Sequence, residues 1–373
     1  MASGASGGGG SADPWAWLGL LKWTLAHQDG TKPSDISPMT EEDKAFLEKV
    51  MKEGIIDENE RMKFILQEFS NAMEYYQSLS QTTGSTITDD LPSLPISEDA
   101  LEDLLQELRD IVEQIDFARA FVAMKGTTYL LGAVTASSGI PEAIRNQCLG
   151  IMATLAQNNP PVQKELLELS AIKALSELFL QEDEDNVCPM STKVAIIQAI
   201  SAIVRNYDLT ENVFEHLTQA PLLMVKGLDP DPVVTNEKLR TKTLFFLNAF
   251  LTSDTSSSAR VNKFADAVNM VADPQYLDDG SNYQLREYSI GMLQQFLERK
   301  MGIKILLQRK ELLVSLGVQR ISAMRALTGE EADMAQIELE QWESFLVLLA
   351  RAKAEDETAS SLTTANAPMM IAM

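Results

Sequence analysis

The sequence has few of the residues that build disulfide frameworks and metal sites. Its 373 residues include two cysteines, Cys148 and Cys188, and two histidines, His27 and His216. Two cysteines cannot form the several disulfides typical of small secreted domains, so we expect a reducing compartment. The histidines are far apart in sequence and have no second ligand at metal-binding spacing. We therefore expect no zinc site and no cofactor.

Long hydrophobic runs and targeting signals are also missing. No apolar run reaches the ~18–20 residues that a helix needs to span a bilayer. Residues 1–13 are rich in Gly and Ser and lack the basic stretch that precedes the apolar core of a signal peptide. We expect no membrane partner. The predicted compartment is the cytoplasm, with the nucleus as an additional location.

Positive charge is scarce. The chain carries 31 Lys and Arg against 54 Asp and Glu, a formal net charge of -23. A nucleic-acid-binding protein neutralises phosphates with Lys and Arg, so nucleic acid is not an expected partner. A neutral or basic protein surface fits this charge better, and the charge also favours a soluble monomer.

The sequence lacks the motifs of common enzyme classes. It contains no Gly-rich phosphate loop followed by Lys and Ser or Thr, no nucleophile elbow and no metal-binding helix motif. Its many carboxylates fall on polar helix faces. We therefore predict that the protein is not an enzyme.

What the sequence does contain is one helical pattern after another. Ser97 is a predicted N-cap, with acidic residues in the turn that follows it. The next apolar residues recur with a helical period, at Leu101, Leu104, Leu105, Leu108, Ile111, Val112 and Ile115. Similar patterns continue to about residue 352, and no alternating strand of convincing length interrupts them. The predicted fold class is all-α.

Four helical segments repeat along the chain. Each begins with a basic residue and ends ten residues later with a large apolar one. The segments are Arg145–Leu155, Lys193–Ile203, Arg240–Phe250 and Arg286–Phe296, so their ends are separated by 48, 47 and 46 residues. Armadillo and HEAT repeats have periods of about 40–47 residues. The spacing predicts an armadillo-like α-solenoid, whose stacked units bury faces that no single unit could cover.

The predicted organisation has four parts. Residues 1–38 form a flexible N-terminal segment with a short Trp- and Leu-rich helix, and 39–96 contain N-terminal helices and a linker. Residues 97–352 contain the repeats, and 353–373 form a disordered tail. A curved solenoid presents a long concave surface, which favours binding of an extended or bulky protein partner.

A block near the N-terminus resembles one family. It consists of Leu20-Leu21-Lys22-Trp23-Thr24-Leu25-Ala26-His27, then Asp29-Gly30-Thr31-Lys32-Pro33, then Met39-Thr40-Glu41-Glu42-Asp43-Lys44. This block is similar to the start of the armadillo-type nucleotide exchange factors of cytosolic Hsp70, the family of Hsp70-binding protein 1 and its fungal and plant counterparts. Gln157-Asn158-Asn159-Pro160 and Val204-Arg205-Asn206, which follow two repeat helices, extend the likeness. The later repeats depart from the family pattern.

The resemblance implies a mechanism. Family members clasp the ATPase domain of Hsp70 with the concave armadillo surface and distort it, so that ADP leaves, ATP rebinds and the client protein is released. Two other functions stay open. A passive armadillo scaffold or peptide-binding adaptor would use the same surface, and an ER-lumenal exchange factor of similar fold would require a signal peptide.

Two sets of residues are candidates for contact with a partner. The basic residues that open the repeated helices could grip acidic patches, or could instead pair with nearby carboxylates: Arg145, Lys193, Arg240 and Arg286. Polar residues at the helix ends could contact the partner, or could simply end the helices: Gln157, Asn158, Arg205 and Asn206.

The N-terminal helix carries a third candidate set. Its apolar residues form one stripe, made by Trp17, Leu18, Leu21, Trp23 and Leu25. The stripe could dock on the repeats or bind Hsp70 as a client-like segment. A membrane surface is disfavoured because the polar face lacks a basic stripe.

Overall fold

The computed structural model describes residues 41–42, 45, 57–82, 96–136, 139–181, 188–278 and 282–365. The chain divides into two compact units, Met1–Phe64 and Ile65–Met373. Helix α3 (Glu58–Thr82) begins in the first unit and lies within residues 39–96, where N-terminal helices are expected. The fold described below is that of the second unit.

The second unit is built from helices, and the part of it that the structure describes contains no strand. After α3 the helices are α4 (Glu98–Ile111), α5 (Ile115–Ala123), α6 (Gly126–Thr135), α7 (Glu142–Ala156), α8 (Pro160–Glu168), α9 (Ala171–Phe179), α10 (Met190–Val204), α11 (Asp208–His216), α12 (Ala220–Gly227), α13 (Glu237–Leu251), α14 (Ser258–Lys263), α15 (Ala265–Val271), α16 (Pro274–Leu277), α17 (Tyr283–Glu298), α18 (Ile303–Gln308), α19 (Lys310–Arg325) and α20 (Glu330–Ala365).

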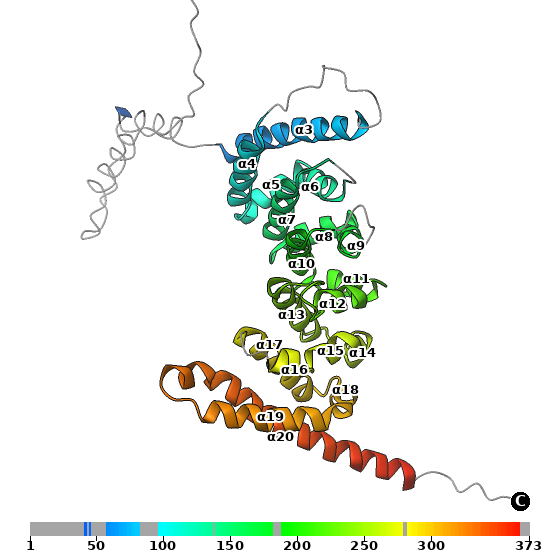
Figure 1. Ribbon diagram of the computed structural model, residues 1–373. Helices are drawn as coiled ribbons and strands as arrows, with labels where there is room; N and C mark the ends of the chain where they lie inside the picture. The colour runs from blue at the N-terminus through cyan, green and yellow to red at the C-terminus, as the bar shows by residue number, and fades with distance from the viewer. Residues whose placement is uncertain are drawn as a thin grey trace, which may run out of the picture. The chain divides into compact units, whose positions relative to one another are not determined.

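The helices stack in three columns. One column contains α5, α8 and α11, and a second contains α6, α9, α12, α15 and α18. The third contains α4, α7, α10, α13, α17 and α20, each packed on the next, and we call these the ladder helices. Figure 1 shows α7, α10, α13 and α17 following one another along one side of the stack, with α9, α12 and α15 on the other. The four predicted repeat segments lie in α7, α10, α13 and α17, which confirms the repeat.

Local sequence determines where several of these helices begin and end. The Ser97 hydroxyl accepts a hydrogen bond from the backbone N–H of Ala100, which confirms the predicted N-cap. The side chains of Asn236 and Asn282 cap α13 and α17 in the same way. After α7 and α10, Asn158 and Asn206 take left-handed backbone conformations, with φ of 53° and 61°. Asparagine tolerates this conformation better than most residues and so ends these helices sharply.

The core runs through the stack along the ladder helices. At the equivalent position of the four repeats lie Ile151, Ala199, Phe246 and Met292, all fully buried. Between α11, α13 and α14, an aromatic cluster forms around Phe214, whose ring centroid lies 5.1 Å from those of both Phe246 and Phe250. Each repeat therefore buries its apolar face against the neighbouring repeats, as the sequence periodicity predicts.

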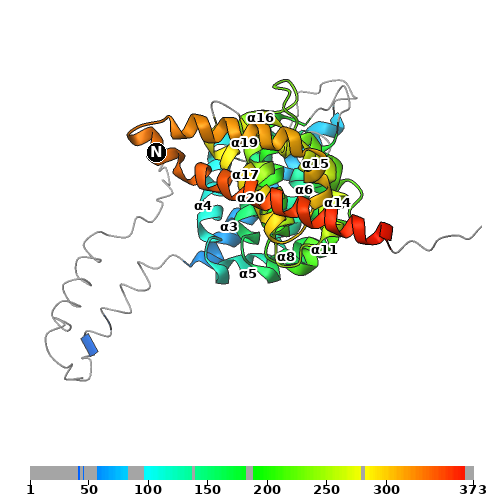
Figure 2. The ribbon, with the colours of Figure 1, turned by 90° about the horizontal axis from the view of Figure 1, so that it is seen from below.

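The last two helices, α19 and α20, lie side by side (Figure 2). Trp342 of α20 is fully buried and packs edge-to-face on Phe345, with centroids 5.8 Å apart. Helix α20 continues to Ala365 and so includes residues that the sequence analysis assigned to a tail beginning at residue 353. Ala, Glu, Lys and Arg dominate residues 350–357, and their high helix propensity accounts for this extension.

Candidate functional site

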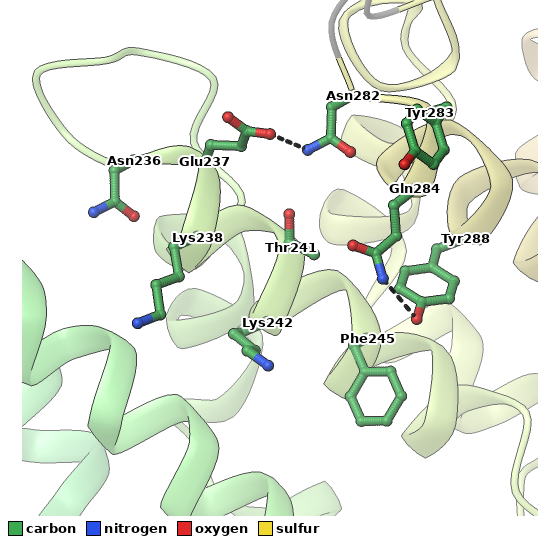
Figure 3. A pocket seen from close by; sticks show the side chains of 10 residues that line it. All are labelled: Asn236, Glu237, Lys238, Thr241, Lys242, Phe245, Asn282, Tyr283, Gln284 and Tyr288. Carbon is green, nitrogen blue, oxygen red and sulfur yellow. Dashed lines mark hydrogen bonds between the residues drawn. The ribbon is translucent and has the colours of Figure 1, made fainter.

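A pocket of about 770 Å³ opens between two ladder helices, α13 and α17. Figure 3 shows the side chains that line it: Asn236, Glu237, Lys238, Thr241, Lys242, Phe245, Asn282, Tyr283, Gln284 and Tyr288. The amide of Asn282 donates to the carboxylate of Glu237 over 2.6 Å, and the amide of Gln284 donates to the Tyr288 hydroxyl over 3.2 Å. The pocket wall therefore combines aromatic rings, two ammonium groups and amides.

A second pocket, of about 320 Å³, adjoins the first. It is lined by Arg109, Ala153, Thr154, Gln157, Gln198, Ser201, Ala202, Arg205, Lys242 and Phe245, from helices α4, α7, α10 and α13 and the residues that follow them. Lys242 and Phe245 belong to both pockets. The two pockets therefore form one groove along the ladder helices from α4 to α17, which we call the ladder groove.

Three planar groups follow one another along the groove. The guanidinium of Arg205 lies over the ring of Phe245, with Cζ 4.6 Å from the ring centroid. The ring of Phe245 is tilted by 52° against that of Tyr288, with centroids 6.1 Å apart. A cation–π contact and an aromatic pair of this kind each favour the arrangement by about 0.5–1.5 kcal/mol. The planar row connects the end of α10 with the middle of α13 and the first half of α17, and it leaves Phe245 37% exposed.

The groove collects basic side chains that have no carboxylate partner among the described residues. Arg109 donates from Nε to the Thr154 hydroxyl over 3.1 Å, and Arg205 donates from Nε to the carbonyl of Ser201. Lys238 and Lys242 make no ion pair with a described residue. Figure 3 shows that the Glu237 carboxylate turns toward Asn282 and away from Lys238.

Gln163 of α8 holds the end of α10, where Arg205 enters the groove. Its fully buried amide nitrogen lies 3.0 Å from the carbonyl oxygens of Ala202 and Ile203 and 2.8 Å from that of Arg205. A helix end leaves its last carbonyls without partners in the helix, and a buried carbonyl needs another donor. Gln163 thus ties one repeat to the next and fixes the backbone of Arg205.

Replacing Gln163 with leucine should therefore destabilise the protein by about 1–3 kcal/mol, because two buried carbonyls and one part-buried carbonyl lose their donor while side-chain volume is nearly kept. Urea denaturation followed by circular dichroism measures this change. The matched control is Gln219→Leu, at a half-buried position outside the joint whose side chain makes no capping hydrogen bond. Equal stability of Gln163→Leu and the parent protein would contradict the role assigned to Gln163.

The equivalent joint one repeat later uses charge. Glu211 of α11 occupies the place of Gln163, 48 residues on, and is buried. Its carboxylate lies 2.9 Å from Nη1 of Arg260, and the same Nη1 donates to the carbonyl of Phe250 near the end of α13. Glu215 lies 2.7 Å from Nε of Arg260. An arginine neutralised by two glutamates thus caps α13, much as a neutral amide caps α10.

The four basic residues that open the repeat helices are half-buried and engaged within the fold. Arg145 donates to the carbonyl of Ala136, and Lys193 lies 5.6 Å from the ring centroid of Phe179. Arg286 pairs with Glu338 over 3.0 Å. Arg240 lies close enough to Tyr276 to lower the pKa of its hydroxyl, although burial raises that pKa more. None of the four lines the ladder groove, and their contact with a partner stays a prediction.

The four polar residues at helix ends divide into two pairs. Gln157 and Arg205 line the ladder groove. Asn158 and Asn206 are exposed beside it and join successive repeats, since the amide of Asn206 donates to the side-chain oxygen of Asn158 over 2.9 Å. The stripe formed by Trp17, Leu18, Leu21, Trp23 and Leu25 lies outside the described residues.

Sequence reasoning missed most of the groove residues, including Arg109, Lys238, Lys242, Phe245 and Tyr288. A signal for two of them was present. Lys242 and Tyr288 each stand two residues after the basic residue that opens their repeat. Two residues correspond to about 200° around a helix, so these side chains lie opposite the basic column.

The two cysteines are unpaired and buried. Burial raises the pKa of the Cys148 thiol to about 12 and that of Cys188 to about 11, so neither is poised as a thiolate nucleophile. Over the described ranges no group of His, Cys, Asp and Glu is arranged to hold a metal ion. No helix in that part of the chain is both long and apolar enough to cross a bilayer.

Comparison with known proteins gives structural likeness only. No family model matches the sequence, and no curated protein matches it. Among solved structures, an engineered protein aligns with a TM-score of 0.51 and 12% identity, covering 75% of this chain and 97% of its own. A computationally designed armadillo repeat protein for modular peptide recognition aligns with a TM-score of 0.50 and 14% identity, covering 74% of this chain and 99% of its own.

These likenesses confirm the predicted fold class. The described helices form an armadillo-like α-solenoid.

Proposed function

We propose that the protein is a non-enzymatic nucleotide exchange factor for cytosolic Hsp70. The observation that carries this proposal is the N-terminal block Leu20–Lys44, which resembles the start of that family and precedes repeats of the armadillo-like fold that the family uses. The departure of the later repeats from the family pattern leaves the contact residues to be identified by experiment. The ladder groove and the residues around it are the proposed surface for the ATPase domain.

The mechanism follows from thermodynamic linkage. A protein that weakens ADP binding to Hsp70 must itself bind the ADP complex more weakly, by the same coupling free energy. The factor must therefore favour an opened conformer of the ATPase domain over the closed, ADP-bound one. A clasp of this kind buries more than the ~1,600 Å² of a standard interface.

The test is release of fluorescent ADP from the Hsp70 ATPase domain, chased with excess ATP in a stopped-flow instrument. Saturating full-length protein should accelerate release by about tenfold or more, a drop of about 1.4 kcal/mol in the barrier. A buffer chase and an unrelated acidic protein serve as controls. Unchanged release at saturating protein would reject this function.

A second candidate is a scaffold or adaptor that binds an extended peptide without affecting nucleotide exchange. The open ladder groove, lined by amides, cations and aromatic rings, favours this reading. A stable complex with a peptide, together with no binding to the Hsp70 ATPase domain, would identify the adaptor. Recovery of the protein from the ER lumen would instead revive the ER-lumenal exchange factor.

A further inference from the structure

The charge of the ladder groove is opposite to that of the whole chain. The net charge is -23, yet the residues that line the α4–α13 pocket include Arg109, Arg205 and Lys242 and not one Asp or Glu. The neighbouring α13–α17 pocket is lined by Lys238, Lys242 and a single carboxylate, that of Glu237, which accepts a hydrogen bond from the Asn282 amide and turns away from Lys238. The groove is therefore a local basic surface on an acidic protein.

Several other cations in the same stack pair with carboxylates of the fold. Arg260 pairs with Glu211 and Glu215, and Arg320 pairs with Glu338 over 2.8 Å. Exposed Arg325 also pairs, with Glu343. A chain with 54 carboxylates could supply partners to its groove cations, but among the described residues it does not. The groove cations are thus available to carboxylates from another molecule.

Partial burial makes such a partner favourable. Burial lowers the pKa of the Arg205 guanidinium, which means that the charged form has lost hydration. A carboxylate placed against the guanidinium would replace the lost hydration with a charge-assisted hydrogen bond. Cations that are already partly desolvated by the fold gain more from such a bond than fully exposed ones, where water screens the interaction.

The groove also offers sites for the rest of a peptide. Gln157, Gln198 and Ser201 line it beside the cations, and amides and hydroxyls of this kind can bond to the N–H and C=O groups of an extended backbone. Phe245, 37% exposed, and Tyr288 provide a tilted aromatic surface at the point where the two pockets meet. A planar or apolar side chain of the ligand would pack there.

We infer that the ladder groove binds an extended acidic segment of a partner protein, with carboxylates at Arg109, Arg205 and Lys242 and an aromatic side chain against Phe245 and Tyr288. This inference goes beyond the proposed function, because it names the chemistry of the ligand and holds whether the partner is Hsp70 or another protein. For the groove itself it replaces the neutral or basic partner surface that the net charge alone suggests with an acidic segment.

Fluorescence anisotropy with synthetic peptides tests the inference. The probe is a fluorescein-labelled peptide of about 12 residues that contains Glu, Tyr and Ser, and its partner probe has Lys at every Glu position. The full-length protein should bind the acidic probe with a micromolar Kd in about 0.1 M NaCl and should bind the lysine probe at least tenfold more weakly. Replacing Tyr with Ser in the acidic probe should also weaken binding.

Matched variants locate the site. Lys242→Glu should weaken binding of the acidic probe by about tenfold, the effect of a lost and reversed charge contact. Lys242→Arg should keep the affinity. Lys304→Glu makes the same change in net charge at an exposed position of α18 and should leave binding within about twofold. If Lys242→Glu lowers the melting temperature, Lys242→Gln is measured in its place.

Three results would overturn the inference: equal binding of the acidic and lysine probes, equal binding by the Lys242 and Lys304 charge reversals, or preferential displacement of the acidic peptide by a single-stranded oligonucleotide. The last result would identify nucleic-acid phosphates as the ligand. None of these results depends on Hsp70, so failure here is distinguishable from failure of the ADP-release experiment.

Discussion

Replacement of Arg260 with methionine is expected to lower the free energy of unfolding by about 3–5 kcal/mol, because it leaves buried carboxylate charge without its counter-ion. Glu211 is 4% exposed, and its Oε2 lies 2.9 Å from the guanidinium. The same change removes the donor to the Phe250 carbonyl and the cation over the Phe250 ring. Urea denaturation monitored by circular dichroism measures the loss.

Two further variants separate the buried charge from the lost side chain. Lys173→Met breaks an exposed pair with Glu177 on α9 and should change stability by no more than about 1 kcal/mol. The double variant Arg260→Met with Glu211→Leu should recover part of the loss, because it removes a buried carboxylate together with its partner. If the double variant is no more stable than Arg260→Met alone, the buried charge is not the cause.

The second large effect is expected at Phe214. Substitution by alanine should cost about 3–5 kcal/mol, the usual cost of deleting a buried aromatic side chain and leaving a cavity. Phe214 contacts the rings of Phe246, Phe250 and Phe264, at centroid distances of 5.1, 5.1 and 6.2 Å. The cluster joins α11, α13 and α14, so hydrogen exchange should increase most in these helices.

Leu222→Ala is the control for this cavity. Leu222 lies on α12, close in the chain to Phe214, but its side chain is 50% exposed. The truncation should therefore change stability by less than about 0.5–1 kcal/mol. A loss as large as that of Phe214→Ala would contradict the assignment, because alanine favours helix and an exposed leucine leaves no buried cavity.

The repeat could be predicted because each repeat has an apolar face that only its neighbours can cover. Ile151, Ala199, Phe246 and Met292 stand at one position of four similar helices, and in the structure all four are buried between neighbouring units. Local capping was also readable at Ser97, where the hydroxyl bonds to a backbone N–H three residues on. Apolar spacing and capping act within a few residues, so one sequence reveals them.

The candidate groove could be predicted only in part. Gln157 and Arg205 were found from their place at helix ends, and both line the groove. The basic column was the more conspicuous pattern, yet Arg286 turns to Glu338 and Lys193 packs over Phe179. Packing between repeats determines which face of a ladder helix contacts the other columns. The position of a basic residue within its repeat does not show whether the residue lies on that face.

Arg109 is another groove residue that the repeat pattern could not predict. It lies on α4, before the first of the four aligned repeat segments, so no repeat-equivalent position drew attention to it. In the structure its guanidinium reaches the Thr154 hydroxyl on α7, 45 residues away in sequence. Contacts between successive ladder helices bring such residues together. An alignment of the repeats matches equivalent positions in these helices, but it does not show which residues of neighbouring helices are in contact.

The contrast between an acidic chain and a basic ladder groove affects how a ligand arrives. At 0.01 M salt the Debye length is about 30 Å, so the negative field of the whole molecule repels an acidic ligand before the ligand reaches the groove. Near 0.1 M salt the field shortens to about 10 Å, so long-range repulsion fades while the partly buried groove cations still act at contact. Encounter rates should therefore pass through a maximum at intermediate salt, and ligands whose remaining surface is neutral or basic would approach fastest.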